Sequence, residues 1–228
     1  MEFVFIRHGQ PQWSVDGMSQ PDPVLTDLGH DQARRAAERL AQAPRPITEI
    51  LVSPAQRSQQ TAIPLAEATG LPPTTVDDLL EIQMPNWENT PEETVQKLFV
   101  EARGRPPEDW WDGLSGGESF RTFHHRVTRG IQSILAERGI SPDAFQRPHL
   151  WDHAGDDRRI AIVAHGGTNS VALTFLLGVE PTPWEWERFL LAHASIARVR
   201  TIDLAGAHVF SLRAFNDQEH LPLDMRSR

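Results

Sequence analysis

The sequence predicts an α/β protein of three layers (α/β/α), in which helices cover both faces of a mostly parallel central sheet and a helical lid is inserted. Two observations carry this prediction. Over residues 3–70, short apolar runs alternate with segments of helical periodicity in the order strand, helix, strand, helix. Much later, a fully apolar run at residues 160–164 is again followed by a helical segment, which is typical of another buried parallel strand.

The first strand is expected at residues 3–6, directly before Arg7. Residues 10–24 then form a polar loop with several prolines, which is long enough to be a candidate substrate loop. Thr26 is placed as the N-cap of the first helix, because its side chain can accept a hydrogen bond from a free backbone N–H and small apolar residues follow at helical spacing.

The second strand is expected at residues 47–52. Ser53 and Pro54 have the order typical of a helix start, a capping residue followed by proline at the first helical position, and Gly70 is placed to end that helix. Pro64 lies inside the helix and predicts a kink or a break, because proline lacks the backbone N–H and its ring clashes with the preceding turn.

Residues 79–117 interrupt this regular pattern. Proline, tryptophan and acidic residues accumulate there, and only residues 91–103 keep helical spacing, so we expect an inserted lid that holds one helix. A long amphipathic helix follows at residues 118–138. Residues 141–157 are polar and contain proline, which predicts a surface loop.

The last third of the chain completes the expected sheet. A helix follows the apolar run and two closing strands pair as a hairpin; these three elements are expected at residues 168–177, 196–202 and 208–212. The length suits one core that carries an inserted lid, so we expect a single domain over residues 1–228, with the lid inserted at about residues 79–117.

Composition narrows the classes of function. The formal charge of -9, from 22 basic and 31 acidic residues, argues against general binding to nucleic acid, whose phosphates would be repelled. The chain has no cysteine, which excludes disulfides, thiolate metal sites and a cysteine nucleophile and fits a reducing compartment. Arg7 interrupts the first apolar stretch, so we expect neither a signal peptide nor a transmembrane helix, and we expect a cytoplasmic location.

Two histidines stand directly after predicted parallel strands. Arg7, His8 and Gly9 follow the first strand, and His165 and Gly166 follow the later apolar run. Because the carboxyl ends of parallel strands meet at one edge of a sheet, where open α/β folds bind ligands, we expect the two imidazoles to lie together. An imidazole beside a guanidinium supplies the nucleophile and the fixed positive charge that phosphoryl transfer without a metal ion requires.

Two further residues are suited to a phosphate site. Arg57 lies in the first turn of a helix that follows a strand, where free N–H groups and the helix dipole already attract anions. Glu81 stands among apolar residues at the start of the lid, and a carboxyl enclosed in this way can act as a general acid. His149 and His153 offer an alternative zinc site, but they lack the glutamate of a His-Glu-x-x-His helix and lie among loop-forming residues, so a solvated loop is the better explanation.

Several short motifs occur in a fixed order along most of the chain. They are Arg7-His8-Gly9, Leu25-Thr26 with Gly29 and Gln32-Ala33, Ser53-Pro54 with Arg57 and Thr61-Ala62, Leu79 with Glu81, Gly116-Gly117-Glu118-Ser119, and His165-Gly166. With this ordered set the chain resembles the histidine phosphatase superfamily, in its phosphoglycerate-mutase-like branch. Any one motif is a weak match, whereas the ordered set is highly specific.

The resemblance implies a phosphatase that acts on a small phosphomonoester. By comparison with the family, His8 is the nucleophile and becomes phosphohistidine, His165 assists at the phosphoryl group, and Glu81 protonates the leaving group. The same carboxylate can then help water to attack the phosphohistidine. The attack needs a neutral imidazole, which is available at neutral pH because the ordinary pKa of histidine is about 6.5.

The phosphate is expected to be held by protein groups alone, with no metal and no cofactor. The resemblance implies that Arg7, Arg57 and His165 bind the phosphoryl group, and the amide of Gly166 can add a hydrogen bond. The expected partner is a small phosphorylated metabolite, with no nucleic acid and no membrane. Dimers are common among the proteins that the chain resembles, so a homodimer is one assembly that we consider.

The sequence also departs from the family pattern. Ser14 stands where the family usually has an asparagine that touches phosphate, and Asn89 stands where glycine is common. The late His-Asp motif of acid phosphatases and phytases is missing, as is the longer stretch that marks glycolytic mutases. A phosphatase is therefore favoured, while a phosphoglycerate-mutase-type phosphotransferase and a catalytically silent phosphate-binding module stay open as alternatives.

Overall fold

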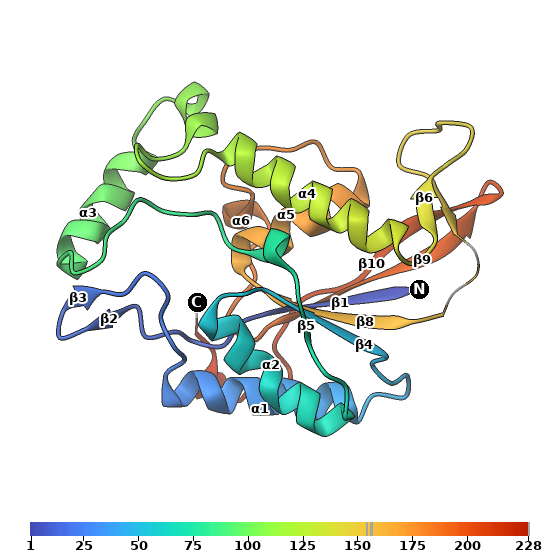
Figure 1. The fold of residues 1–228 in the computed structure, drawn as a ribbon, viewed down its shortest axis with the longest axis horizontal. Coiled ribbons are helices and arrows are strands. Elements are labelled where there is room, and N and C mark those ends of the chain that lie inside the picture. Colours follow the sequence, from blue (N-terminus) through green and yellow to red (C-terminus); the bar gives the residue numbers. More distant parts are fainter. Residues whose placement is uncertain (154, 156, 228) are drawn as a thin grey trace.

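The computed structural model describes residues 1–153, 155 and 157–227, and its centre is one large mixed sheet (Figure 1). In spatial order the strands are β5 (Thr74–Thr75), β4 (Glu49–Val52), β8 (Arg159–Ala164), β1 (Glu2–Arg7), β9 (Ile196–Leu204), β10 (Ala207–Asp217), β7 (Trp151–His153) and β6 (Ile140–Pro142). The ladders from β5 to β1 are parallel, and those from β1 to β6 are antiparallel. The parallel half carries the strands that end in the two histidines.

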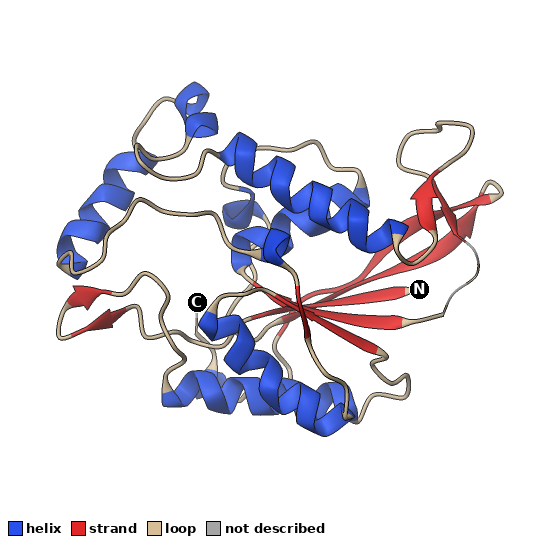
Figure 2. Cartoon of the chain, in the orientation of Figure 1, coloured by secondary structure: helices blue, strands red, loops and turns tan. Residues whose placement is uncertain are grey.

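Helices cover both faces of the sheet (Figure 2). The first face carries α1 (Asp27–Ala41) and α2 (Gln56–Thr69), and the opposite face carries α4 (Phe120–Ala136), α5 (Gly166–Leu177) and the short α6 (Glu185–Arg188). Strand β1 shows why both faces are needed: Phe3 and Phe5 point into the core under α4 and α5, whereas Val4 and Ile6 point into the core under α1 and α2. The expected three-layer α/β fold is therefore confirmed.

The expected lid segment holds α3 (Glu92–Arg103), which matches the predicted helix, and the short turn η2 (Pro107–Asp112); another short turn, η1 (Asp77–Leu79), leads into it. Beside α3 lies a small hairpin of β2 (Ser14–Val15) and β3 (Met18–Ser19), so the expected loop at residues 10–24 contains a short two-stranded sheet (Figure 1). The Ser19 amide donates to the Thr90 carbonyl at 2.9 Å, and the Ser14 hydroxyl donates to Glu92 at 2.7 Å. The candidate substrate loop and the expected lid are thus hydrogen-bonded to each other.

The start of α2 differs from the prediction. The helix begins at Gln56, and its N-cap is Ala55, whose own side chain makes no capping hydrogen bond. Ser53 is not a cap because its hydroxyl lies 2.7 Å from the imidazole of His165. The helix continues through Pro64, so a break there is also wrong, whereas Gly70 ends it in the left-handed conformation, as expected.

Residues 141–157 are not one surface loop, because β6 and β7 within them extend the sheet by pairing with each other and with β10. The closing hairpin is confirmed, with Ala205 and Gly206 both at positive φ in its turn. After β10, the short turn η3 (Leu223–Met225) leads the C-terminal residues back to the edge of the sheet where β1 ends and β9 begins. Within the described part of the chain, no helix is both long and apolar enough to cross a membrane.

Candidate active site

The parallel pairing of β1 and β8 brings the two predicted histidines together. Arg7 and Ala164 face each other in register at the ends of these strands, and the next residues are His8 and His165. The His8 amide donates to the Ala164 carbonyl at 2.9 Å, and the two imidazole rings lie 5.1 Å apart between centroids. The expectation that both imidazoles lie at one edge of the sheet is therefore confirmed.

His8 is held in one tautomer by its surroundings. Its Nδ1 lies 2.8 Å from the Gly9 carbonyl, which can only accept, so the ring hydrogen is on Nδ1. Its Nε2 consequently carries a lone pair and accepts a hydrogen bond from Nε of Arg57 at 3.3 Å. Burial lowers the pKa of His8 well below 6.5, and the neighbouring His165, Arg57 and Arg7 lower it further. The result is a neutral, buried imidazole whose lone pair points toward a cation.

Besides its hydrogen bond to His8, Arg57 contacts two side chains that hold it in place. It lies in the first turn of α2, and its terminal nitrogen Nη1 donates to Asp22 at 3.3 Å. The Asp22 carboxylate also accepts from the backbone N–H of Gln56 at 3.1 Å, and so takes over the role of a cap at the start of α2. The guanidinium lies 5.1 Å from the centre of the Trp13 ring, a cation–π distance. Asp22 and Trp13 thus orient the cation that faces His8.

Arg7 approaches the same site from the end of β1. Its terminal nitrogens contact the Leu191 carbonyl at 2.6 Å and Nε2 of His193 at 3.2 Å, while its Nε is buried without a partner. The guanidinium packs on Gly166, where a side-chain Cβ would lie 3.5 Å from Nε of Arg7. Burial lowers the pKa of Arg7 to about 10, and the negative charge of Glu81 opposes this effect. At any physiological pH the group is therefore still a cation.

His165 is fully buried at the N-terminus of α5. Its Nε2 lies 2.7 Å from the Ser53 hydroxyl, and its Nδ1 is buried without a partner. Burial lowers the pKa of His165 well below 6.5, with Arg57 and Arg7 adding to the effect. The unpartnered Nδ1 of His165 and the unpartnered Nε of Arg7 are two buried nitrogen atoms whose hydrogen-bonding capacity an anion could satisfy.

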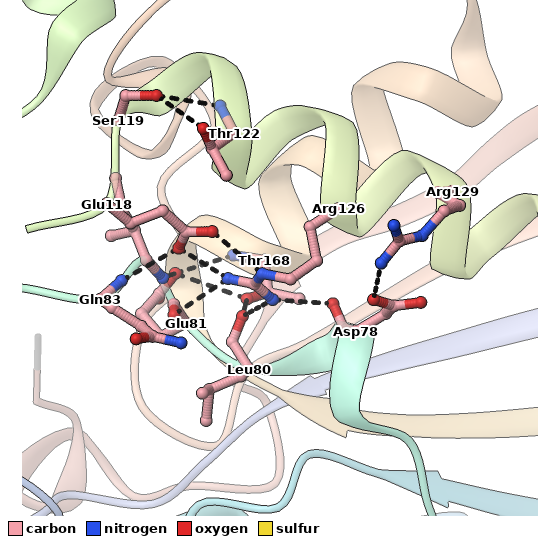
Figure 3. Close-up of polar contacts among 11 residues, drawn as sticks. Asp78, Leu80, Glu81, Gln83, Glu118, Ser119, Thr122, Arg126, Arg129 and Thr168 are labelled. Carbon is pink, nitrogen blue, oxygen red and sulfur yellow. Dashed lines mark hydrogen bonds and ion pairs between the residues drawn. The ribbon is translucent and has the colours of Figure 1, made fainter.

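Glu81 lies at the N-terminus of α5, as Figure 3 shows. One carboxylate oxygen accepts from the Gly167 amide at 2.9 Å, and the other accepts from the Thr168 amide at 3.2 Å and from the amide of Ile82 at 3.0 Å. The free N–H groups at the start of a helix can donate to carboxyl oxygens in this way. The sequence led us to expect apolar neighbours for this carboxyl; the structure adds three backbone N–H donors, from Ile82, Gly167 and Thr168.

Two glycines are required by close approach. At Gly9, a Cβ would lie 2.4 Å from the Gly29 carbonyl oxygen, and the Gly9 amide donates to the Thr61 hydroxyl at 3.0 Å. At Gly167, a Cβ would lie 2.5 Å from a Glu81 carboxylate oxygen. Both contacts leave no room for a side chain. Gly9 directly follows His8, and Gly167 stands two residues after His165. Because neither has a side chain, another segment of the chain can approach each histidine closely.

The structure brings the predicted site residues to one place: Arg7, His8, Arg57, Glu81, His165 and Gly166. It also adds residues that sequence reasoning missed, namely Asp22, Ser53 and His193. His193 is 2 % exposed, its ring lies 5.7 Å from that of His8, and burial lowers its pKa to about 3. Its Nε2 accepts from Arg7, so its Nδ1 carries the hydrogen and donates to Ser227 at 2.9 Å.

Three other sequence features lie elsewhere. The Ser14 hydroxyl is used to join the hairpin to α3, so the structure does not place it as a phosphate ligand. Asn89 has a φ of 57°, which asparagine tolerates, so the departure from glycine keeps the turn. Among the described residues, no group of three or more histidine, cysteine or carboxylate side chains is placed to hold a metal ion.

The chain is similar in sequence to known proteins. The family model of the histidine phosphatase superfamily (branch 1) matches residues 3–217. A glucosyl-3-phosphoglycerate phosphatase of Mycolicibacterium vanbaalenii is 29% identical over 183 residues, which cover 79% of this chain and 76% of that protein. A Yersinia enterocolitica protein named probable phosphoglycerate mutase GpmB is 30% identical over 206 residues, covering 87% and 84%.

Solved structures give the same result. The α-ribazole phosphatase of Shigella flexneri has a TM-score of 0.71 at 25% identity and covers 95% of this chain and 96% of its own. A mycobacterial glucosyl-3-phosphoglycerate phosphatase in complex with inorganic phosphate has a TM-score of 0.69 at 25% identity, covering 97% and 99%. The matched residues 3–217 include both histidines, Arg57 and Glu81, and the chain accordingly belongs to branch 1 of the histidine phosphatase superfamily.

Proposed function

We propose that this chain is a metal-independent phosphatase that hydrolyses a small phosphomonoester through a phosphohistidine on His8. One observation carries the proposal. The neutral His8 ring is locked by the Gly9 carbonyl so that Nε2 keeps its lone pair, and this atom lies where Arg57, Arg7 and His165 concentrate positive charge and hydrogen-bond donors. A nucleophile and a binding site for a phosphoryl group thus coincide.

In the first step, Nε2 of His8 attacks phosphorus and the bond from phosphorus to the leaving oxygen breaks. The guanidinium groups of Arg57 and Arg7 balance the charge on the phosphoryl oxygens, the work that a metal ion does in other phosphoryl-transfer enzymes. A Ser53 hydroxyl that donates to Nε2 of His165 leaves a hydrogen on Nδ1 for a phosphoryl oxygen. Protonated Glu81 gives its proton to the leaving oxygen, which departs as an alcohol.

In the second step, water attacks the phosphohistidine. The Glu81 carboxylate takes a proton from the water, the bond from nitrogen to phosphorus breaks, and orthophosphate leaves. His8 returns to the neutral form and Glu81 to the protonated form, so the cycle balances. The bond from Nδ1 of His8 to the Gly9 carbonyl stabilises the ring while it carries the phosphoryl group, because an imidazolium N–H is a stronger donor.

The relatives support a small anionic substrate. Their names include glucosyl-3-phosphoglycerate phosphatase and phosphoserine phosphatase, both of which refer to small phosphomonoesters. The relative named as a phosphoglycerate mutase supports a second candidate, in which phosphohistidine passes its phosphate to another hydroxyl rather than to water. The cytoplasmic location, the lack of nucleic-acid and membrane partners, and a homodimer stay predictions.

The test is a rapid-quench experiment on wild type and His8→Ala with a panel of phosphorylated metabolites. We expect acid-labile, alkali-stable phosphate on the wild type only, and turnover that EDTA does not change. Normal turnover by His8→Ala would refute the mechanism. Adding a competing hydroxy acid separates the two candidates, because a mutase would transfer label to the acceptor faster than water releases it. A silent binding module would show neither label nor turnover.

A further inference from the structure

The segment that carries Glu81 has no regular secondary structure of its own. After η1, residues 80–90 form neither helix nor strand. The Glu81 carboxylate nevertheless meets the amides of Gly167 and Thr168, which belong to a different element. A side chain is placed only as accurately as the backbone that carries it, so something outside this segment must hold it.

Arg126 of α4 supplies these hydrogen bonds. One terminal nitrogen, Nη1, donates to the carbonyls of Asp78 at 3.1 Å and Leu80 at 2.9 Å, and the other, Nη2, donates to the carbonyl of Glu81 at 3.3 Å (Figure 3). The three acceptors come from the backbone immediately before and at Glu81. Only a planar guanidinium offers enough fixed donors for this, because an ammonium group has three donors at a single point.

Glu118 fixes Arg126 in turn. Its two carboxylate oxygens accept from Nε and Nη2 of Arg126 at 3.0 and 2.8 Å, a bidentate pair, and both side chains are largely buried, at 16% and 9% exposure. Glu118 also accepts from the Gln83 amide at 3.1 Å and donates its own amide to the Gln83 carbonyl at 2.7 Å. Arg126 and Glu118 together therefore hold the backbone on both sides of Glu81.

We propose that Arg126 and Glu118 are positioning residues that place Glu81 for proton donation to the leaving group. The inference rests on the proposed function, because it assumes that Glu81 is the proton donor. It goes further by making the accuracy of donation depend on two side chains that contact backbone atoms of the Glu81 segment rather than the phosphate. Their loss should harm the reaction in proportion to the need of the leaving oxygen for a proton.

A purely structural role predicts something different. Loosening of the fold would lower the rate for every substrate by the same factor. Loss of proton donation would spare an ester whose leaving group is stable as an anion, such as 2,4-dinitrophenyl phosphate, and would slow an alkyl phosphate. The ratio of kcat/KM values for these two esters therefore separates the two explanations.

The experiment measures this ratio for wild type, Arg126→Met, Arg126→Lys and Glu118→Gln. Glu81→Gln is the reference variant, because it removes the proposed proton donor to the leaving oxygen. Arg129→Met is the matched control, because Arg129 lies on the same helix and pairs with the Asp78 side chain at 2.8 Å without touching the backbone near Glu81. Thermal unfolding and circular dichroism identify variants that fail to fold. If Arg126→Met fails to fold, the milder substitutions Glu118→Gln and Arg126→Lys still test the inference.

We expect Arg126→Met to lower kcat/KM for the alkyl ester by about 10- to 100-fold more than for the dinitrophenyl ester, because small errors in placing a reacting group slow a reaction by this factor. Glu81→Gln should change the ratio of the two kcat/KM values in the same direction. Arg126→Lys and Glu118→Gln should show the same bias more weakly, and Arg129→Met none. Equal losses on both esters, or an unchanged ratio, would overturn the inference. If Glu81→Gln itself shows no bias, both the assigned donor and the inference fail; if only the Arg126 and Glu118 variants lack it, the inference fails alone.

Discussion

Nε of Arg57 donates a hydrogen bond to Nε2 of His8 across 3.3 Å. A donor at this atom requires that the imidazole offer its lone pair there, and the Gly9 carbonyl at Nδ1 imposes the same tautomer from the other side. The ring that we propose as the nucleophile is therefore oriented before any substrate enters, and the cation that we propose binds the phosphoryl group is already in place. Such preorganisation removes a cost that would otherwise be paid during the reaction.

The first prediction concerns the protonation of His8. Its pKa is lowered well below 6.5, chiefly by burial, so the neutral form should persist as the pH falls through 6.5 and be lost only at lower pH. Arg57→Ala removes one positive neighbour and should raise the pKa, but not to 6.5, because burial and His165 still lower it. Nitrogen-15 NMR of the histidine rings, with His8→Asn for assignment, measures both. A His8 resonance that titrates at 6.5 in the wild type would contradict the prediction.

The second prediction concerns Ser53, whose hydroxyl lies 2.7 Å from Nε2 of His165. Ser53→Ala leaves that buried nitrogen without its near partner and lets the ring change tautomer, so kcat/KM for a phosphomonoester should fall by about tenfold, the equivalent of one buried hydrogen bond. Ser58→Ala is the matched control, because the Ser58 hydroxyl is equally buried but lies 3.5 Å from the same atom. Equal effects of the two substitutions would argue against a specific role for Ser53.

The third prediction concerns His193, which accepts a hydrogen bond from Arg7 at 3.2 Å and has its own Nδ1 fixed by Ser227. His193→Ala should remove one of the two hydrogen bonds that hold the Arg7 guanidinium, leaving the one to the Leu191 carbonyl, and should weaken inhibition by inorganic phosphate by about tenfold. His193→Gln keeps an acceptor at similar reach and should restore part of the affinity. The inhibition constant for phosphate measures this, and an identical constant in all three proteins would be evidence against it.

The fourth prediction concerns Gly9, where a Cβ would lie 2.4 Å from the Gly29 carbonyl oxygen. Gly9→Ala should destabilise the fold by about 1–3 kcal/mol, because two backbone segments must move apart. It should also lower activity, since Gly9 holds Nδ1 of His8. Gly104→Ala is the control: a Cβ there meets nothing closer than 3.5 Å, so stability should change by less than about 0.5 kcal/mol. Urea unfolding of both variants tests the difference.

The direction of the strands decides which site residues the sequence could predict. Parallel strands β1 and β8 end at the same edge, so the residues that follow them, His8 and His165, had to meet once both apolar runs were identified. His193 could not be found in this way, because it precedes the antiparallel strand β9, which begins at that edge. A residue before a strand becomes a neighbour of the site only when the direction of pairing is known.

The errors in local structure have a related cause. Ser53 is a residue type that often caps helices, but its hydroxyl is hydrogen-bonded to His165. Asp22, from a loop distant in the sequence, accepts from the first N–H of the helix instead. Residues 141–157 are polar and loop-like in sequence, and β6 and β7 form there because β10 offers an unpaired edge. In each case a partner far along the chain outweighs the local preference, which is worth only a few tenths to about 1 kcal/mol per residue.

The sequence by itself determined the layers of the fold, the edge at which the chemistry lies and the residue types that carry it, because hydrophobic periodicity and residue chemistry are local properties. Only the tertiary structure decided how those residues are held. The tautomer of His8, the binding of Glu81 at the start of α5, and the support of the Glu81 segment by Arg126 and Glu118 depend on hydrogen bonds between segments distant in the chain. Such bonds require distances and directions, and these exist only once the chain has folded.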